Sequence, residues 1–340
     1  MIIVMSPDSR EDDVALVVER LGERGYGHHI SRGEQRTIIG AIGAPDHEKE
    51  VVAGQLTALP GVERVVPILK PYKLISREYN PQPGTVMIGN ARFGPGHVGV
   101  IAGPCSIETR EQILQTARAV KEAGATALRG GAFKPRTSPY SFQGLGYEGL
   151  ELLAEAREET GLPIVTEVMD VRQVDRIAEV ADCLQIGARN MQNYDLLKEA
   201  GRCGRPIMLK RGFSSTVGEW LRATEYIAAG GTLDIILCER GIRTFEDATR
   251  FTMDLSSIAV LRRETFLPVV ADPSHAVGIA SLVPPMALAA VAAGADGLLI
   301  EVHPRPDQAL SDGPQSLTPA AFAELMQQIR RVAEAIGRDV

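Results

Sequence analysis

The chain has 340 residues, of which 44% are hydrophobic and 23% charged, and its formal net charge is −7. The acidic charge argues against nucleic acid and against an anionic membrane surface as partners, and no apolar run approaches the ~18 residues that a transmembrane helix needs. The length allows one barrel of ~250 residues together with a small second domain.

Residues 1–70 are predicted to form a small ferredoxin-like domain with the element order βαββαβ. Short strands are expected at 1–5, 27–31, 36–43 and 62–69, and amphipathic helices at 10–25 and 46–59. This part of the chain contains no cluster of catalytic side chains. Residues 71–84 are rich in proline and polar side chains, which predicts a linker.

Residues 85–340 are predicted to form a (β/α)8 TIM barrel. Eight apolar strands are expected at 97–103, 125–130, 163–168, 183–187, 206–210, 234–239, 268–272 and 297–301. Helices are expected between them, with clear amphipathic patterns at 108–123, 148–160 and 318–336. The loop after the second strand, 131–146, is longer than most strand-to-helix connections, which favours a functional role.

Four residues at or beyond the strand ends could hold a metal ion, namely Cys105, His275, Glu301 and Asp312. A thiolate, an imidazole and two carboxylates suit Mn, Fe, Co or Zn better than Mg or Ca. Each residue also has an ordinary structural explanation: a small buried cysteine, a capping histidine or an Asp-Gly turn. Their predicted convergence on one rim favours the metal, but spacing alone does not decide between the two.

A second group of strand-end residues is cationic: Arg129, Lys134, Arg136, Arg189, Lys210 and Arg240. Arginine binds phosphate and carboxylate through a two-pronged fork, and lysine acts as a point charge. The alternative is a set of rim salt bridges with Glu167 and Glu239. Six cations at one barrel mouth of an acidic protein indicate a local site for anionic, phosphorylated substrates.

Six segments at the strand ends together resemble one enzyme family: IAGPCSIE (101–108), LRGGAFKPRTSP (128–139), QIGARNMQN (185–193), MLKRG (208–212), DPSHAVG (272–278) and IEVHP (300–304). They closely resemble 3-deoxy-D-arabino-heptulosonate 7-phosphate (DAHP) synthase of the Iβ subgroup, over essentially the whole barrel. A ferredoxin-like N-terminal domain is a known variant of that subgroup. The Lys-Pro-Arg-Thr run at 134–137 is the form used by this family, whereas related 3-deoxy-manno-octulosonate 8-phosphate synthases have Lys-Ala-Asn-Arg-Ser.

The resemblance implies a metal-dependent condensation of phosphoenolpyruvate with erythrose 4-phosphate, the first step of the shikimate pathway. It implies Cys105, His275, Glu301 and Asp312 as ligands of one divalent metal ion. It implies Arg129, Lys134, Arg189, Lys210, Arg240 and the backbone of Ala188 for phosphoenolpyruvate, and Arg136 and Thr137 for the phosphate of erythrose 4-phosphate. Lys134 is our candidate proton donor, and Glu167 could orient or deprotonate the attacking water.

Two other functions remain as alternatives. One is a related condensation on the same barrel, of the octulosonate 8-phosphate or sialic acid type. The other is a non-catalytic sensor of sugar phosphates. Retention of the whole ligand and cation set argues against a sensor, because a sensor need not keep an oxidisable metal-binding cysteine.

The sequence and the resemblance also predict how the protein is regulated, how it assembles and where in the cell it is found. Family members with this small domain are typically feedback-inhibited by tyrosine or phenylalanine, so the resemblance implies an aromatic effector. His29 and Ser31 alternate onto one side of a strand and are the candidate effector contacts. We expect a homodimer or homotetramer. The first residues lack the features of a signal peptide and the four cysteines contain no CxxC pair, so a reduced, cytoplasmic protein is expected.

Overall fold

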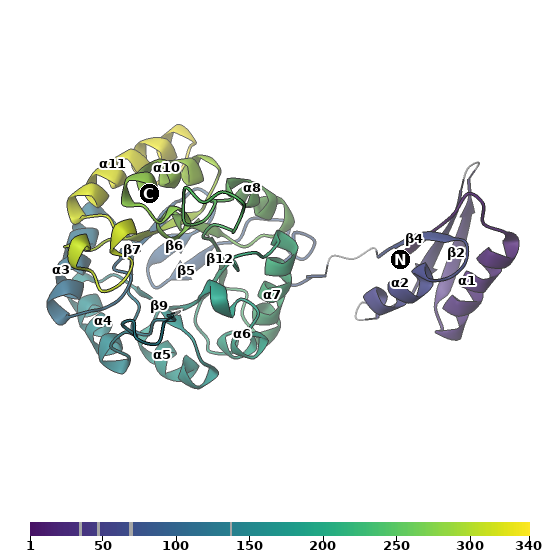
Figure 1. Cartoon of the computed structure of the whole chain (residues 1–340), viewed down its shortest axis with the longest axis horizontal. Helices are drawn as coiled ribbons and strands as arrows, with labels where there is room; N and C mark the ends of the chain where they lie inside the picture. The colour runs from purple at the N-terminus through teal and green to yellow at the C-terminus, as the bar shows by residue number, and fades with distance from the viewer. Residues whose placement is uncertain (34–35, 46–47, 68–70, 137) are drawn as a thin grey trace. The chain divides into compact units, whose positions relative to one another are not determined.

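The structure is a computed structural model that describes residues 1–33, 36–45, 48–67, 71–136 and 138–340. The chain divides into two compact units, Met1–Pro71 and Tyr72–Val340, which are drawn in Figure 1 and are considered separately below. Among the described residues, no helix combines the length and the apolar character that a bilayer span requires.

The first unit has the predicted ferredoxin-like fold. Its elements are β1 (Ile2–Met5), α1 (Glu11–Glu23), β2 (Gly27–Arg32), β3 (Thr37–Ile42), α2 (Lys49–Thr57) and β4 (Val62–Val66). The antiparallel sheet has the order β2-β3-β1-β4. Its core contains Ile3, Val17 and Ile39, which are fully buried together with side chains of both helices. Strand β4 ends before the predicted residue 69, and residues 68–70 lie outside the described part of the chain.

The second unit is the predicted barrel of eight parallel strands. They are β7 (Gly99–Gly103), β8 (Ala127–Arg129), β9 (Ile164–Val168), β10 (Cys183–Ile186), β11 (Ile207–Lys210), β12 (Ile235–Glu239), β13 (Val269–Ala271) and β14 (Gly297–Glu301), and β14 pairs with β7 to close the barrel. The surrounding helices in Figure 1 are α3 (Arg110–Ala123), α4 (Tyr147–Thr160), α5 (Val174–Val180), α6 (Tyr194–Ala200), α7 (Val217–Gly230), α8 (Leu255–Glu264), α10 (Val283–Ala292) and α11 (Pro319–Ala335). A short helix, α9 (Pro273–Val277), follows β13 directly.

A hairpin that the sequence did not predict packs under the barrel. It consists of β5 (Val86–Ile88) and β6 (Ala91–Phe93), whose inward side chains join a buried cluster with inner residues of the barrel strands. The ring of Phe93 occupies the space where a side chain at Gly99 would lie. Strands of three residues are too short to show a clear alternating pattern, which explains why the sequence did not reveal them.

The stretch predicted as a linker, 71–84, is bound to the barrel from Tyr72 onward. Tyr72 and Ile75 are buried in the barrel's outer core. The backbone N–H groups of Lys73 and Leu74 donate to Glu225 Oε1 at 2.8 and 2.9 Å. Two apolar side chains in a polar segment are enough to anchor this part of the chain to the barrel unit.

Polar side chains at the C-terminal ends of the barrel strands point into the barrel interior. Side chains two residues apart on a strand point to the same side. Inner-cluster residues such as Val165, Met208 and Leu299 are therefore followed, two positions later, by polar residues that point in the same direction. Those polar residues are Arg129, Glu167, Gln185, Lys210, Arg240, Asp272 and Glu301. An apolar layer thus supports a layer of charged and polar side chains at the C-terminal mouth.

Candidate active site

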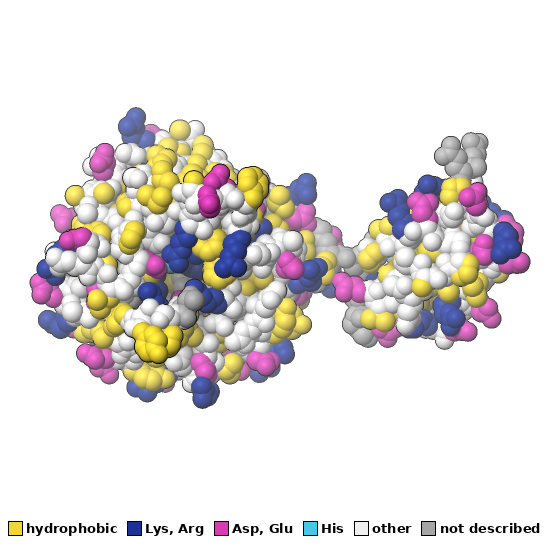
Figure 2. All heavy atoms as spheres, in the orientation of Figure 1, with side chains coloured by type: hydrophobic (Ala, Val, Ile, Leu, Met, Phe, Trp, Pro, Cys, Tyr) yellow, Lys and Arg dark blue, Asp and Glu magenta, His cyan; other side chains and the backbone are white. Residues whose placement is uncertain are grey.

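A cavity of about 410 Å³ opens at the C-terminal ends of the barrel strands. Its lining includes eight basic side chains, Arg129, Lys134, Arg136, Arg189, Lys210, Arg240, Arg243 and Arg250, and two carboxylates, Glu167 and Asp312. Figure 2 shows dark-blue basic side chains gathered around a hollow in the middle of the barrel. In a protein of net charge −7, this concentration of positive charge suits a small polyanionic ligand.

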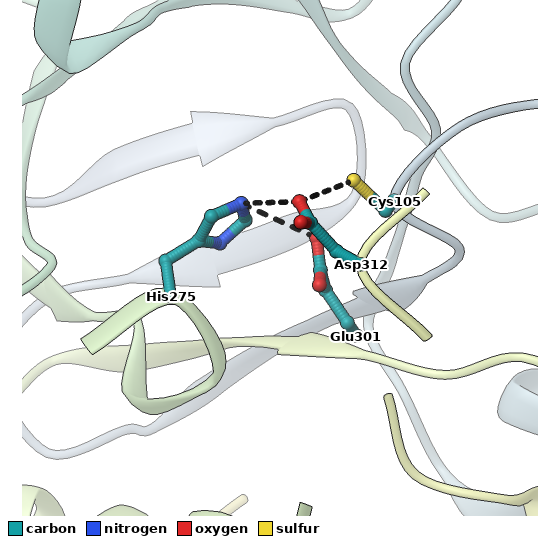
Figure 3. Close-up of side chains that lie close together, drawn as sticks. All are labelled: Cys105, His275, Glu301 and Asp312. Carbon is teal, nitrogen blue, oxygen red and sulfur yellow. Dashed lines mark hydrogen bonds and ion pairs between the residues drawn. The ribbon is translucent and has the colours of Figure 1, made fainter. Parts of the chain in front are cut away.

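The four candidate metal ligands come together beside this cavity (Figure 3). One donor atom from each of Cys105, His275, Glu301 and Asp312 lies within 4.8 Å of the others. Cys105 Sγ is 3.1 Å from Asp312 Oδ2, and His275 Nε2 is 3.3 Å from Glu301 Oε1. The sequence predicted that these residues meet at one rim and left open whether they hold a metal. The fold brings them together from the loop after β7, helix α9, the end of β14 and the loop before α11.

Neighbouring residues hold these four side chains in place. Asp272 Oδ2 lies 2.8 Å from His275 Nδ1, which leaves Nε2 directed toward Glu301 and Asp312. Gln315 Nε2 donates to Glu301 Oε2 at 2.6 Å. Such outer contacts orient metal ligands in proteins. Asp312 has φ +51°, the single positive value for a non-glycine among the described residues, and backbone strain of this kind is concentrated at functional sites.

The chemistry of the donor set fits a divalent transition metal. Burial, reinforced by the charge of Glu301, raises the pKa of the Cys105 thiol to about 12. The pKa of Asp312 is lowered even though burial opposes this, chiefly because of His275. The group therefore holds two carboxylates, a neutral thiol and an imidazole in the absence of metal. A bound cation favours the thiolate, and this mixed set matches Mn, Fe, Co and Zn.

Two of the predicted cations are paired with carboxylates at the floor of the cavity. Arg129 Nη1 lies 2.5 Å from Glu301 Oε1, and Lys210 Nζ lies 2.6 Å from Asp272 Oδ2. Lys134 takes a different partner: its Nζ donates to the backbone carbonyl of Cys105 at 3.0 Å. Burial opposes the charge of Lys134, but the nearby Cys105 and Glu167 outweigh it and raise its pKa, so Lys134 remains protonated.

Comparison with protein families identifies the chain. A model described as DAHP synthetase I family matches residues 77–336, and one described as DAHP synthase ferredoxin-like domain matches residues 1–70. The chain belongs to the DAHP synthetase I family. The family predicted from the six strand-end segments is thereby confirmed, together with its N-terminal domain.

Relatives of this DAHP synthetase I family chain include a phospho-2-dehydro-3-deoxyheptonate aldolase from Thermotoga maritima, 50% identical over 337 residues and 99% of each chain. A crystal structure of the T. maritima enzyme covers 100% of this chain and 98% of its own, with a TM-score of 0.92 at 49% identity. A 2-dehydro-3-deoxyphosphooctonate aldolase from Syntrophotalea carbinolica is 39% identical over 69% of this chain and 91% of its own. The heptonate relative is thus similar over both units, whereas the octonate relative covers a smaller part.

Most residues predicted for substrate binding in this DAHP synthetase I family chain line the one cavity. Ala188 and Arg189 lie in a short 3-10 turn, Ala188–Asn190, directly after β10. Glu167 lies beside them, and Gln185 Nε2 donates to its Oε2 at 3.4 Å. Arg136 is also on the wall, while Thr137 lies outside the described residues. Glu239, considered as a rim salt-bridge partner, instead pairs with Arg211 at 2.9 Å.

Sequence reasoning missed several residues of the cavity wall. Arg243, Arg250 and Phe251 lie in the irregular segment between β12 and α8, and Phe213 lies in the turn after β11. Arg250 Nη1 donates to Gln315 Oε1 at 2.8 Å and lies 3.4 Å from Asp312 Oδ1. This segment has no periodic pattern, and the single available signal was the density of arginines at 240, 243 and 250.

Proposed function

We propose that the protein condenses phosphoenolpyruvate with erythrose 4-phosphate and water to give DAHP and phosphate, at the first step of the shikimate pathway. Membership of the DAHP synthetase I family supports this reaction. The observation that carries the proposal is a single cavity that joins a four-residue metal-ligand group to eight basic side chains. Both substrates are polyanions, and the cavity offers the positive charge that must hold them side by side.

Cys105, His275, Glu301 and Asp312 are proposed to hold one divalent metal ion, which is Mn, Fe, Co or Zn. When bound, the ion supplies Lewis-acid polarisation of the sugar aldehyde. Arg129, Lys134, Lys210, Arg189, Arg240 and the backbone of Ala188 are proposed to bind phosphoenolpyruvate. Arg136 and Thr137 are proposed to bind the phosphate of erythrose 4-phosphate.

The protein side chains then guide bond formation. The enol carbon of phosphoenolpyruvate attacks the aldehyde, and Lys134 is proposed to donate the proton that the new hydroxyl needs. Water adds at the carbon that bears the phosphate, oriented or deprotonated by Glu167, which is buried at the cavity wall. The resulting hemiketal collapses with C–O cleavage and releases phosphate. Lys134 is buried beside the cavity and keeps its proton, so it has a proton to give, although its raised pKa makes it a weaker acid than a group with a pKa near neutrality.

Release of inorganic phosphate tests the reaction. The full-length protein is incubated with phosphoenolpyruvate and either erythrose 4-phosphate or arabinose 5-phosphate, across a panel of divalent metals. We expect phosphate release with the four-carbon sugar to be faster. A preference for arabinose 5-phosphate would support the octulosonate reaction, and no release under any condition would support a non-catalytic sensor.

Arg136→Ala is expected to raise the KM for erythrose 4-phosphate by about ten- to a hundredfold, since one charge-assisted contact to a remote phosphate is lost. The kcat and the KM for phosphoenolpyruvate should stay close to the parent values. Steady-state kinetics with each substrate varied in turn measure this. Arg172→Ala, at an exposed arginine that pairs with Asp170, is the matched control. A rise confined to the KM for phosphoenolpyruvate would show that Arg136 serves the other substrate.

The small unit is proposed to bind tyrosine or phenylalanine as a feedback inhibitor. His29 and Ser31 are exposed on the edge strand β2 and pair with Gly40 and Ile38. Paired residues share a face, so both lie on the side of the sheet opposite the buried Ile39. The exposed Ile38 and Ile42 lie on that same side, which supports self-association into a homodimer or homotetramer.

A chain starting at Tyr72 is expected to stay active and to lose inhibition by both amino acids. A truncated T. maritima synthase, 46% identical over 79% of this chain with a TM-score of 0.75, supports an independent barrel. In the full-length protein, His29→Ala should weaken inhibition. His28→Ala should not, because His28 points to the other face of the same strand. Equal inhibition of the full and truncated chains would exclude the small unit as the sensor.

The proposed location is the cytoplasm. All four cysteines, Cys105, Cys183, Cys203 and Cys238, are free thiols in the structure. This state suits a reducing compartment.

A further inference from the structure

Arg240 stands apart from the other deeply buried cations at the cavity. It is 3% exposed, and its Nη1 has no hydrogen-bond partner among the described residues. Arg211, similarly buried, contacts Glu239 at 2.9 Å and Asp254 at 2.8 Å. Burial lowers the pKa of Arg240 to about 10, so it stays charged at neutral pH. A buried charge that lacks a hydrogen-bonded counterion is costly until an anion binds to it.

Two aromatic rings hold this guanidinium, whereas Arg129, Lys210 and Arg211 have carboxylate partners. Its carbon lies 4.1 Å from the ring centre of Phe251 and 4.9 Å from that of Phe213. The two rings are stacked, with centres 5.2 Å apart and planes 9° apart. An aromatic face attracts a cation without neutralising its charge and without occupying its N–H donors.

The protein backbone fixes both rings. The N–H of Arg243 donates to the carbonyl of Phe213 at 2.7 Å, which joins the segment after β12 to the turn after β11. The N–H of Phe251 donates to the carbonyl of Ala276 at 2.8 Å, which joins the same segment to helix α9 beside His275. Gly241 leaves the space that Phe251 needs, because a side chain there would collide with Phe251 Cβ. Arg240 is therefore placed by groups from the turn after β11, the segment after β12 and helix α9.

Further guanidinium groups gather around the same rings. Arg189 and Arg243 each lie 5.4 Å from the centre of Phe213. Both rings and all three arginines line the cavity. The aromatic pair thus organises several like charges that would otherwise repel one another, and it does so without a carboxylate that would compete with a bound anion.

From this geometry we infer that Phe213 and Phe251 are positioning residues, which hold Arg240 with its charge and donors free for the phosphate group of phosphoenolpyruvate. The inference rests on the proposed function and adds to it a device for phosphate recognition. The two rings contact the guanidinium and carry no group that can transfer a proton, so they should affect binding of this substrate rather than the chemical step.

Phe213→Leu and Phe251→Leu in the full-length protein test the inference. We expect each to raise the KM for phosphoenolpyruvate and the Ki of inorganic phosphate against it in parallel, by about 3- to 30-fold. The kcat and the KM for erythrose 4-phosphate should remain near the parent values. Phe213→Tyr and Phe251→Tyr keep the aromatic face, so these variants should bind phosphoenolpyruvate and inorganic phosphate about as tightly as the parent protein, unlike the leucine variants. Tyr226→Leu is the matched control, because Tyr226 stacks on Tyr194 beside Lys198, outside the cavity lining.

Three results would overturn the inference: parent-like KM and Ki values in both leucine variants, an equal rise in KM for the two substrates, or failure of tyrosine to restore binding. Arg240 contacts both rings, so either leucine variant suffices if the other does not fold. Calorimetric binding of inorganic phosphate separates this inference from the proposed reaction. Phosphate affinity that falls in Arg240→Ala and in the leucine variants would uphold the positioning role even in a protein that does not turn over phosphoenolpyruvate.

Discussion

Lys134→Met is expected to lower kcat by about 10²- to 10⁴-fold, the contribution typical of a general acid. The methionine keeps most of the length of the side chain and removes its charge and its proton. Lys134 is 6% exposed at the cavity, and its Nζ donates to the carbonyl of Cys105 at 3.0 Å. The loss should therefore appear in kcat, and the KM for phosphoenolpyruvate should also rise because one cation is missing.

Lys121→Met is a matched control, since Lys121 lies in the last turn of α3, away from the cavity lining. It should leave both constants close to those of the parent. Thermal unfolding of both variants reports whether the fold is intact. A folded Lys134→Met enzyme with parent-like kcat would assign the proton transfer to another group, with Glu167 as the next to test.

Removal of the metal is expected to abolish activity, and added Mn or Co should restore it. Cys105→Ser should weaken metal binding by more than the ~10- to 100-fold that loss of an outer partner costs, because a soft thiolate ligand becomes a neutral hydroxyl. Cys203→Ser, at a half-buried free cysteine outside the metal group, is the control. Metal affinity measured by calorimetry and metal content measured after dialysis check this independently of activity. Full activity in a preparation shown to be metal-free would contradict it.

The pH dependence of metal binding has a defined sign. The pKa of the Cys105 thiol is about 12 without metal, so the thiol carries a proton at neutral pH and must lose it to become a ligand. Affinity should therefore rise with pH, by about tenfold per unit for one released proton. Calorimetry in two buffers of different ionisation enthalpy counts that proton. Cys105→Ser should abolish the release, and an unchanged proton count in this variant would assign the proton to another ligand.

The amino-acid sequence by itself determined the two-part architecture and most of the cavity wall. Apolar strands that end in Arg129, Lys210 and Glu301 are unusual. A charged residue at the end of a buried strand is expected only where several strand ends converge on one site. Inward residues recur every second position along a strand, so an apolar layer below dictates a polar layer above. Local patterns of this kind are read directly from the order of residues.

Tertiary structure alone decided which of these groups meet. Cys105 and Asp312 are 207 positions apart, and no local pattern can state that their side chains lie 3.1 Å from each other. Closure of the barrel brings β14 beside β7 and makes that contact. It also decides which cations are neutralised, as Arg129 is by Glu301, and which are not.

The sequence also could not predict where the irregular segments of the chain are placed. The positions of Phe213 and Phe251 depend on single backbone hydrogen bonds to Arg243 and Ala276, which belong to other segments of the chain. The chain from Tyr72 likewise packs on the barrel through a few buried groups in a polar stretch. Strands and helices repeat their contacts and so leave a periodic trace in the sequence, whereas these segments are placed by individual long-range contacts that leave none.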